Sequence, residues 1–148
     1  MKVLFLHGLE SKPGGTKSIY LKDKGHQVLD PSLPKSSFPE SVEIAQREVD
    51  EEQPDIIVGS SRGGAVAMAV NPRGARLVLV APAWRNYGVS PNVPAGTIVL
   101  HSTTDDVIPY KDSQQIKGAS AVVPVGDDHR MSDQEALTAI GRAVQGGF

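Results

Sequence analysis

The pattern Gly-x-Ser-x-Gly at residues 59–63 constrains the fold of this chain more than any other feature. It follows Asp55 and a β-branched apolar run at residues 56–58, and it precedes an apolar run at residues 65–70 that is typical of a buried helix. Between a strand and a helix, this pattern makes a sharp turn that exposes the serine hydroxyl. Gly59 and Gly63 are needed because a Cβ at either position would collide with neighbouring backbone. We interpret Ser61 as a candidate nucleophile; a Ser/Gly-rich connection without chemistry is the alternative.

Apolar runs of strand length lie on both sides of this turn, mostly separated by segments with helical periodicity. Strands are expected at residues 2–6, 26–31, 76–80, 97–101 and 119–125, and helices at residues 16–24, 38–53, 109–116 and 133–144. We expect Thr16 and Ser132 to be N-caps. This alternation predicts an α/β fold of three αβα layers, with a mostly parallel six-stranded sheet and helices on both faces.

Length and composition narrow the class of protein. The 148 residues carry no repeat and no linker, which predicts a single domain over residues 1–148. A net charge of −2 gives no basic field, so we expect no nucleic-acid partner. The absence of cysteine excludes disulfides, thiolate metal sites and cysteine nucleophiles. Because no apolar run could span a bilayer and residues 1–6 are too short for a signal peptide, we expect a cytoplasmic protein.

A serine hydroxyl needs a base to take its proton, and histidine is the suitable side chain. Functional residues of parallel sheets gather at the carboxyl ends of the strands. Among the four histidines, His129 lies in the loop between the last strand and the last helix and is free to approach Ser61. His101 ends an apolar strand and is interpreted as a structural histidine bonded to nearby backbone, whereas His26 is interpreted as a surface residue.

The base in turn needs a carboxylate that fixes its tautomer and stabilises the imidazolium. Asp105 and Asp106 follow the strand at residues 97–101, and either could be this acid. The order Ser61, Asp105 or Asp106, then His129 is the Ser…Asp…His order of the α/β-hydrolases. The alternative for the two aspartates is helix capping before Pro109. Residues 127 and 128, also aspartates, are interpreted as turn formers.

Four motifs in this order resemble those of the small capless α/β-hydrolases, which are serine-esterase-like, and the resemblance covers nearly the whole chain. The motifs are His7-Gly8 after the first strand, the turn at residues 59–64, the segment from His101 through Asp105 to Pro109, and Gly126-x-x-His129. The resemblance favours Asp105 as the acid. It also implies a sheet trimmed to six strands in the order 2-1-3-4-5-6. The segment at residues 84–96 is too short for a helical cap.

The resemblance further implies an oxyanion hole formed by the backbone N–H groups of Leu9 and Arg62. For the Arg62 side chain we favour a surface salt bridge over contact with an acidic acyl group. Without a cap, the site is expected to be shallow and open, with His7, Trp84 and Tyr87 as candidate pocket residues. For Trp84, packing over the sheet edge is the alternative.

These features together predict a serine hydrolase, a carboxylesterase that acts on small acyl esters through an acyl-enzyme intermediate, with no metal or cofactor. Its expected partner is a small-molecule ester, and its oligomeric state is left open. One alternative is a non-catalytic ligand-binding protein of the same fold. Another is a phosphate cradle at residues 12–17 in a flavodoxin-like fold, although that segment lacks the Walker spacing.

Overall fold

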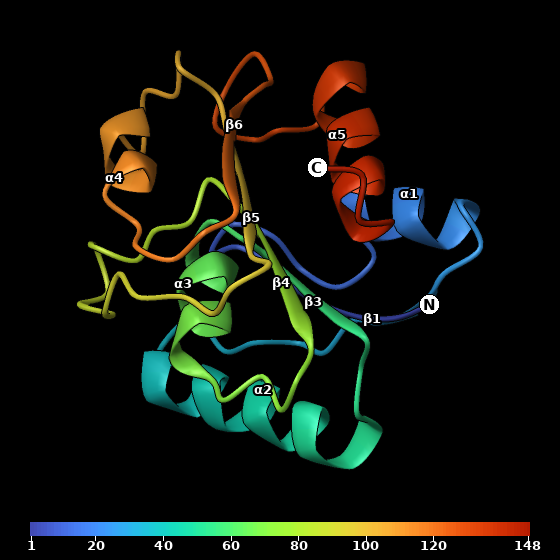
Figure 1. Ribbon diagram of the computed structural model, residues 1–148. Helices are drawn as coiled ribbons and strands as arrows, with labels where there is room; N and C mark the ends of the chain where they lie inside the picture. The colour runs from blue at the N-terminus through green and yellow to red at the C-terminus, as the bar shows by residue number, and fades with distance from the viewer.

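Six parallel strands form one sheet in the computed structural model, which describes residues 1–148 (Figure 1). Their order across the sheet is β2-β1-β3-β4-β5-β6, and every neighbouring pair is parallel. The strands are β1 (Lys2–Leu6), β2 (Gln27–Leu29), β3 (Ile56–Ser60), β4 (Arg76–Val80), β5 (Ile98–His101) and β6 (Ala121–Pro124). The α/β class, the six strands and their order are therefore confirmed.

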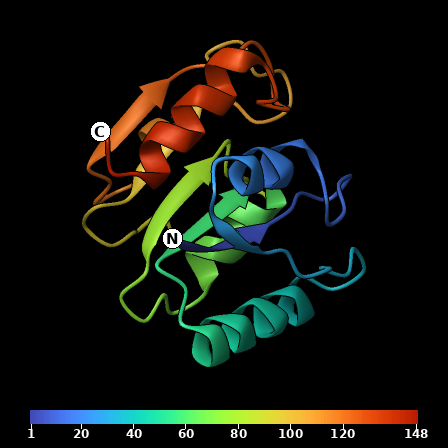
Figure 2. The ribbon, with the colours of Figure 1, turned by 90° about the vertical axis from the view of Figure 1, so that its right-hand side faces the viewer.

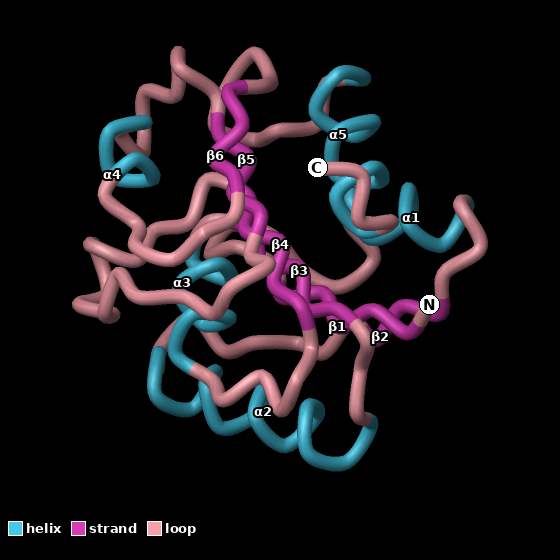
Figure 3. Tube along the Cα trace, viewed as in Figure 1, coloured by secondary structure: helices cyan, strands magenta, loops and turns pink.

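Helices cover both faces of the sheet, as Figure 3 shows with the sheet seen nearly edge-on. Helices α2 (Phe38–Glu52) and α3 (Arg62–Ala69) lie on one face, and α1 (Thr16–Asp23) and α5 (Gln134–Val144) lie on the other. Figure 2 looks onto the face covered by α1 and α5. The short helix α4 (Tyr110–Gln114) follows β5. None of these helices combines the length and the apolar character needed to cross a bilayer.

Two hydrophobic cores lie on opposite faces of the sheet because strand side chains alternate between the faces. Val3 and Phe5 of β1 belong to a core of 17 buried residues that also receives the inner face of α5. Leu4 and Leu6 of the same strand belong to a core of 15 buried residues with α2 and α3. Burial on both faces explains why the strands are continuous apolar runs without polar alternation.

Both expected N-caps are wrong by one residue. Thr16 is the first residue of α1, and Gly15 before it is extended and makes no side-chain cap. Helix α5 is capped by Asp133, whose Oδ2 accepts the Ala136 N–H at 3.2 Å, and not by Ser132. Serine and aspartate are similarly good caps. The difference is that Asp133 Oδ1 also accepts the Asp127 N–H at 3.1 Å, which fixes the aspartate in place.

The connection between β4 and β5 contains no helix and no strand, as expected for a chain without a helical cap. It is held to the rest of the molecule by backbone hydrogen bonds. Val93 N–H donates to the Lys117 carbonyl at 2.9 Å, and Lys117 N–H donates to the Pro91 carbonyl at 2.9 Å. The connection therefore follows the side of the domain as an anchored loop.

Candidate active site

The turn between β3 and α3 holds Ser61 in an unusual backbone conformation. Its φ of 56° and ψ of −115° lie outside the regions that non-glycine residues normally adopt. The peptide groups on both sides are tied to the end of β4 and to the residues that follow it. Ser61 N–H donates to the Val80 carbonyl at 2.9 Å, and the Ser61 carbonyl accepts the Ala83 N–H at 3.0 Å. Strained backbone of this kind persists only where its surroundings determine it, and it is concentrated at functional sites.

Glycine is required at both flanking positions, as the sequence predicted. A Cβ on Gly59 would overlap the backbone of Gly63, and a Cβ on Gly63 would overlap the carbonyl group of Leu6. The next residue, Gly64, is also close-packed, since a Cβ there would lie 2.8 Å from the Pro82 Cβ. The turn between β3 and α3 can lie this close to β1 and to Pro82 only because these positions carry no side chain.

Replacing Gly63 by alanine is expected to destabilise the fold by about 3 kcal/mol or more, since the clash is with backbone that cannot rotate away. The matched control is Gly15→Ala. Gly15 has an ordinary φ of −74°, and a Cβ there would lie 3.7 Å from its nearest neighbour. We expect that control to change stability by less than about 1 kcal/mol. Urea unfolding measures both, and equal midpoints for the two variants would contradict the close-packing argument.

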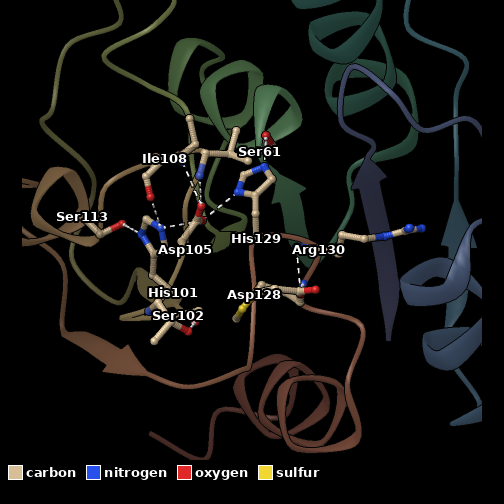
Figure 4. Close-up of polar contacts among 12 residues, drawn as sticks. Ser61, His101, Ser102, Asp105, Ile108, Ser113, Asp128, His129 and Arg130 are labelled. Atoms are coloured by element: carbon tan, nitrogen blue, oxygen red, sulfur yellow. Dashed lines mark hydrogen bonds and ion pairs between the residues drawn. The ribbon is translucent and has the colours of Figure 1, made fainter.

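The structure brings together the three side chains predicted to act in catalysis (Figure 4). Ser61 Oγ lies 2.9 Å from His129 Nε2, and His129 Nδ1 lies 2.7 Å from Asp105 Oδ2. The Asp105 side chain is fully buried, whereas that of His129 is 18% exposed. A hydroxyl, an imidazole and a carboxylate thus form one continuous hydrogen-bonded chain, and its carboxylate end is buried.

Asp105 is held in its charged form by its surroundings. Burial raises the pKa of the carboxyl, but the hydrogen bonds from His129 and from two backbone N–H groups outweigh it and keep the pKa below its usual value. These two groups, Val107 N–H and Ile108 N–H, each donate to Oδ1 at 2.8 Å. Asp106 is exposed and makes no side-chain hydrogen bond. The structure therefore places Asp105, and not Asp106, against His129.

The loop that carries His129 is shaped by Asp128. Its Oδ1 accepts the Arg130 N–H at 3.1 Å and the Met131 N–H at 3.3 Å. Asp127 contributes its backbone, since its N–H donates to Asp133 and its carbonyl accepts the Thr104 hydroxyl at 2.9 Å. Both aspartates shape the turn, as expected, and neither is a hydrogen-bond partner of the imidazole.

His7 is buried and holds the loop after β1, so the expectation that it lines a pocket is wrong. Its Nε2 accepts the Leu33 N–H at 3.0 Å, which leaves Nδ1 as the protonated nitrogen that donates to the Gly8 carbonyl at 2.8 Å. The N–H of a trans peptide points opposite to its C=O. Fixing the Gly8 carbonyl therefore also fixes the direction of the Leu9 N–H, which no protein atom accepts. A Cβ on Gly8 would lie 3.5 Å from the Ser61 Cβ, so this loop lies directly beside the serine.

The Arg62 side chain makes no salt bridge, contrary to expectation. The residue is 2% exposed, and its guanidinium donates to Ser41 Oγ at 3.1 Å and to the Pro34 carbonyl at 2.9 Å. It also lies 5.6 Å from the ring centroids of Phe38 and Tyr87, which stack on each other. The guanidinium is directed toward the start of α2, so it presents no exposed surface to an acyl group.

Trp84 and Tyr87 also pack into the structure. Trp84 is 7% exposed and belongs to the core beneath α2 and α3, and its indole N–H donates to the Asp112 carbonyl at 2.9 Å. Tyr87 is half-buried against Phe38. Trp84 thus follows the packing alternative, and the Tyr87 ring stacks on a side chain of α2.

One residue that contacts the acid was not predicted from the sequence. His101 is fully buried, and its Nε2 lies 2.9 Å from Asp105 Oδ2 as well as 3.0 Å from the Ile108 carbonyl. Bonding to nearby backbone was expected, but contact with the acid was not. The available signal was its position four residues before Asp105, at the end of the strand that leads into the acid-bearing turn.

No protein-family model and no curated protein matches this sequence. Solved structures do match. Alpha/beta hydrolase domain-containing protein 10 from mouse has a TM-score of 0.77 at 16% identity, over 97% of this chain and 88% of that one. The esterase domain of a Rhodothermus marinus protein has a TM-score of 0.67 at 21% identity, over 98% and 84%. A monoacylglycerol lipase from Paleococcus ferrophilus has a TM-score of 0.72 at 16% identity, over 97% and 91%. This chain therefore has the α/β-hydrolase fold, trimmed to six strands and without a cap domain.

Proposed function

We propose that this protein is a serine hydrolase that cleaves small carboxylic esters through an acyl-enzyme intermediate. The observation that carries the proposal is the continuous chain from Ser61 through His129 to Asp105, with contacts of 2.9 and 2.7 Å. A non-catalytic protein of this fold would be expected to hold His129 more than about 5 Å from the serine, beyond hydrogen-bond reach. An esterase and a lipase among the similar structures agree with the proposal.

Ser61, His129 and Asp105 carry the steps of the proposed reaction, which consumes one water molecule. His129 Nε2 takes the proton of Ser61 Oγ as the oxygen attacks the ester carbonyl, and the resulting imidazolium is stabilised by Asp105. The imidazolium then gives its proton to the departing alcohol, which leaves an acyl group on Ser61. A water molecule, deprotonated by the same imidazole, then attacks the acyl carbonyl. The bond to Ser61 Oγ breaks, the imidazolium returns its proton to Oγ, and the carboxylic acid departs.

The negative charge of the tetrahedral intermediate requires preorganised donors. We assign this role to the backbone N–H groups of Leu9 and Arg62. Arg62 is the first residue of α3, so its N–H has no acceptor within the helix and lies at the positive end of the helix dipole. The Leu9 N–H is likewise free of any protein acceptor. Leu9 follows Gly8 and Arg62 follows Ser61, so both N–H groups belong to turns that lie beside the Ser61 side chain.

Replacing His7 by leucine is expected to lower kcat by about 10²–10³, the usual effect of losing one oxyanion donor. The reason is that without His7 the Gly8 carbonyl keeps only the longer hydrogen bond from the Ser11 N–H, at 3.2 Å, so the direction of the Leu9 N–H is fixed less firmly. Steady-state hydrolysis of p-nitrophenyl acetate measures this effect. The control is His26→Leu, since His26 contacts the N-terminal amine at the other end of the sheet. Unchanged kcat in His7→Leu would contradict the role given to His7.

The choice of small esters rests on the surroundings of Ser61. The connection after β4 forms no helical cap, and neither of two surface hollows, of about 650 and 380 Å³, is lined by a triad residue. Val107 is 61% exposed beside the Asp105 turn and offers a limited apolar contact. We infer that short acyl groups fit and that long chains gain little further contact.

The phosphate-cradle alternative loses support in the structure. Gly14 N–H, in the middle of the candidate cradle, donates to Asp30 Oδ2 at 2.7 Å. A carboxylate at this position repels a phosphate and already occupies the N–H that the phosphate would need.

Two measurements test the proposal. An alkyl fluorophosphonate is expected to label the protein at a single residue, identified by peptide mass spectrometry as Ser61. A series of p-nitrophenyl esters from acetate to laurate is expected to show the highest kcat/KM for the short acyl chains. Failure of both labelling and hydrolysis would contradict the proposal, whereas highest activity on long chains would contradict only the inference on acyl length.

A further inference from the structure

The proposed reaction leaves one buried titratable side chain at the site without a role. His101, the last residue of β5, has a fully buried imidazole that contacts the Asp105 carboxylate from the side opposite His129 (Figure 4). The triad acid therefore lies between two imidazole rings. Because the His101 ring contacts Asp105 directly, it can change how strongly this carboxylate stabilises a proton on His129.

The hydrogen-bond partners of His101 fix its tautomer. Nε2 lies 2.9 Å from Asp105 Oδ2 and 3.0 Å from the Ile108 carbonyl, and both of these atoms are acceptors. Nε2 must therefore carry the proton and donate. Nδ1 lies 2.6 Å from Ser113 Oγ of α4, whose hydroxyl can donate to it. A neutral imidazole, protonated on Nε2, thus satisfies every partner.

Both imidazoles use the same oxygen of the acid. Oδ2 of Asp105 accepts from His129 Nδ1 at 2.7 Å and from His101 Nε2 at 2.9 Å, while Oδ1 receives the two backbone N–H groups already described. A donor on Oδ2 withdraws part of the negative charge that would otherwise stabilise the His129 imidazolium. The partial positive charge of the His101 N–H is also directed toward the base.

We propose that His101 is a positioning residue that lowers the proton affinity of His129 by sharing Oδ2 of Asp105. The inference rests on the proposed function in so far as His129 is the base of the reaction. A base with lower proton affinity is unprotonated, and so able to accept the serine proton, over a wider range of pH. The shared oxygen also keeps the carboxylate directed at His129.

His101 does not take the proton itself. Burial lowers the pKa of its imidazole, and although the Asp105 charge and the hydrogen bonds to it raise the pKa, the net direction is down. A charge on His129 lowers the pKa of His101 further, so the two rings are not protonated together. The proton released by Ser61 therefore stays on His129.

Substitutions at His101 leave the other charged groups near His129 unchanged. Its own loop carries Asp127, Asp128 and Arg130, and α1 contributes Lys17. Burial and the charge of Arg130 lower the pKa of Lys17 to about 8, whereas the charge of Asp128 raises it. Any difference between wild type and a His101 variant is thus assigned to the contact with Asp105.

The test compares three variants with wild type. The double variant His101→Leu/Ser113→Ala removes the donor without leaving the Ser113 hydroxyl unpaired. Ser113→Ala alone keeps the Nε2–H donor and is the matched control. His101→Gln places an amide N–H near the position of Nε2 and serves as the conservative rescue. The readout is the titration of His129, followed by the NMR signals of its ring, together with the acid limb of the kcat/KM profile.

Removing the donor is expected to raise the pKa of His129 by roughly half to one unit. The reason is that Oδ2 of Asp105 then regains negative charge that stabilises the imidazolium. The acid limb of the kcat/KM profile should move upward by the same amount. Ser113→Ala and His101→Gln should titrate close to wild type. An unchanged titration in the double variant, or an equal shift in Ser113→Ala, would overturn the proposal.

The ¹⁵N shifts of His101 in the wild-type protein test the same inference if the double variant does not fold. They should report a neutral ring with the proton on Nε2 from pH 5 to pH 8; a proton on Nδ1 would overturn the proposal. The NMR measurements need no turnover. An inactive wild type would therefore contradict the proposed function without touching this inference, whereas activity with no His129 shift would contradict the inference alone.

Discussion

Replacing Ser61 by alanine is expected to lower kcat for p-nitrophenyl acetate by about 10⁴-fold or more and to abolish fluorophosphonate labelling. The reason is that alanine removes the only oxygen within hydrogen-bond distance of His129 Nε2. The remaining activity would come from the oxyanion donors and from water activated by His129. The strained backbone should persist in the variant because the bonds to Val80 and Ala83 involve only backbone atoms.

The neighbouring Ser60→Ala is the matched control. Ser60 is the last residue of β3, is 8% exposed, and makes no side-chain hydrogen bond, so the change removes a hydroxyl one residue from the nucleophile. Labelling and kcat should stay near wild type. If Ser61→Ala kept its activity while Ser60→Ala lost it, the nucleophile would be the other serine, and the assignment of the turn would be wrong.

Replacing Asp105 by asparagine is expected to lower kcat by about 10⁴-fold with little change in KM. An asparagine amide can donate to His129 Nδ1, which moves the ring proton to Nε2 and leaves the base without a lone pair facing Ser61. The geometry of the site would stay nearly the same while the tautomer becomes wrong. Steady-state kinetics on p-nitrophenyl acetate measures the loss.

The matched control for this variant is Asp106→Asn. Asp106 is exposed and has no contact with His129, so the same change in charge one residue away should leave kcat within about two-fold of wild type, as for most surface substitutions. Equal losses in the two variants would indicate a general electrostatic effect. In that case the direct contact between Asp105 and His129 would not explain the loss.

The positions of Ser61 and His129 could be predicted because each depends on local chain signals, whereas the choice of Asp105 over Asp106 came from the resemblance. Ser61 lies in a turn that needs glycines on both sides, and His129 and Asp105 follow strands whose carboxyl ends meet at one edge of the sheet. The alternation of apolar runs and helical segments predicted the parallel sheet, whereas the strand order was implied by the resemblance to the α/β-hydrolases. These features are set by backbone geometry, which short sequence patterns describe well.

What could not be predicted depends on where side chains point. The sequence places Arg62 after the nucleophile but does not show that Phe38 and Tyr87 enclose its guanidinium. His101 ends an apolar strand, and only the turn of the following residues brings Asp105 back against its ring. His7 was expected in a pocket, but its ring is directed at two backbone groups. In each case a long-range contact decides the role.

The anchored connection between β4 and β5 has a consequence for the timing of the proposed reaction. Enzymes with a lid often spend most of a turnover cycle waiting for it to open, so that product release limits the rate. In this chain the connection between β4 and β5, where a lid could be inserted, contains no helix. Substrate entry, hydrolysis of the acyl group and departure of the acid would therefore proceed without a gating motion, and the chemical steps themselves would set the speed of turnover.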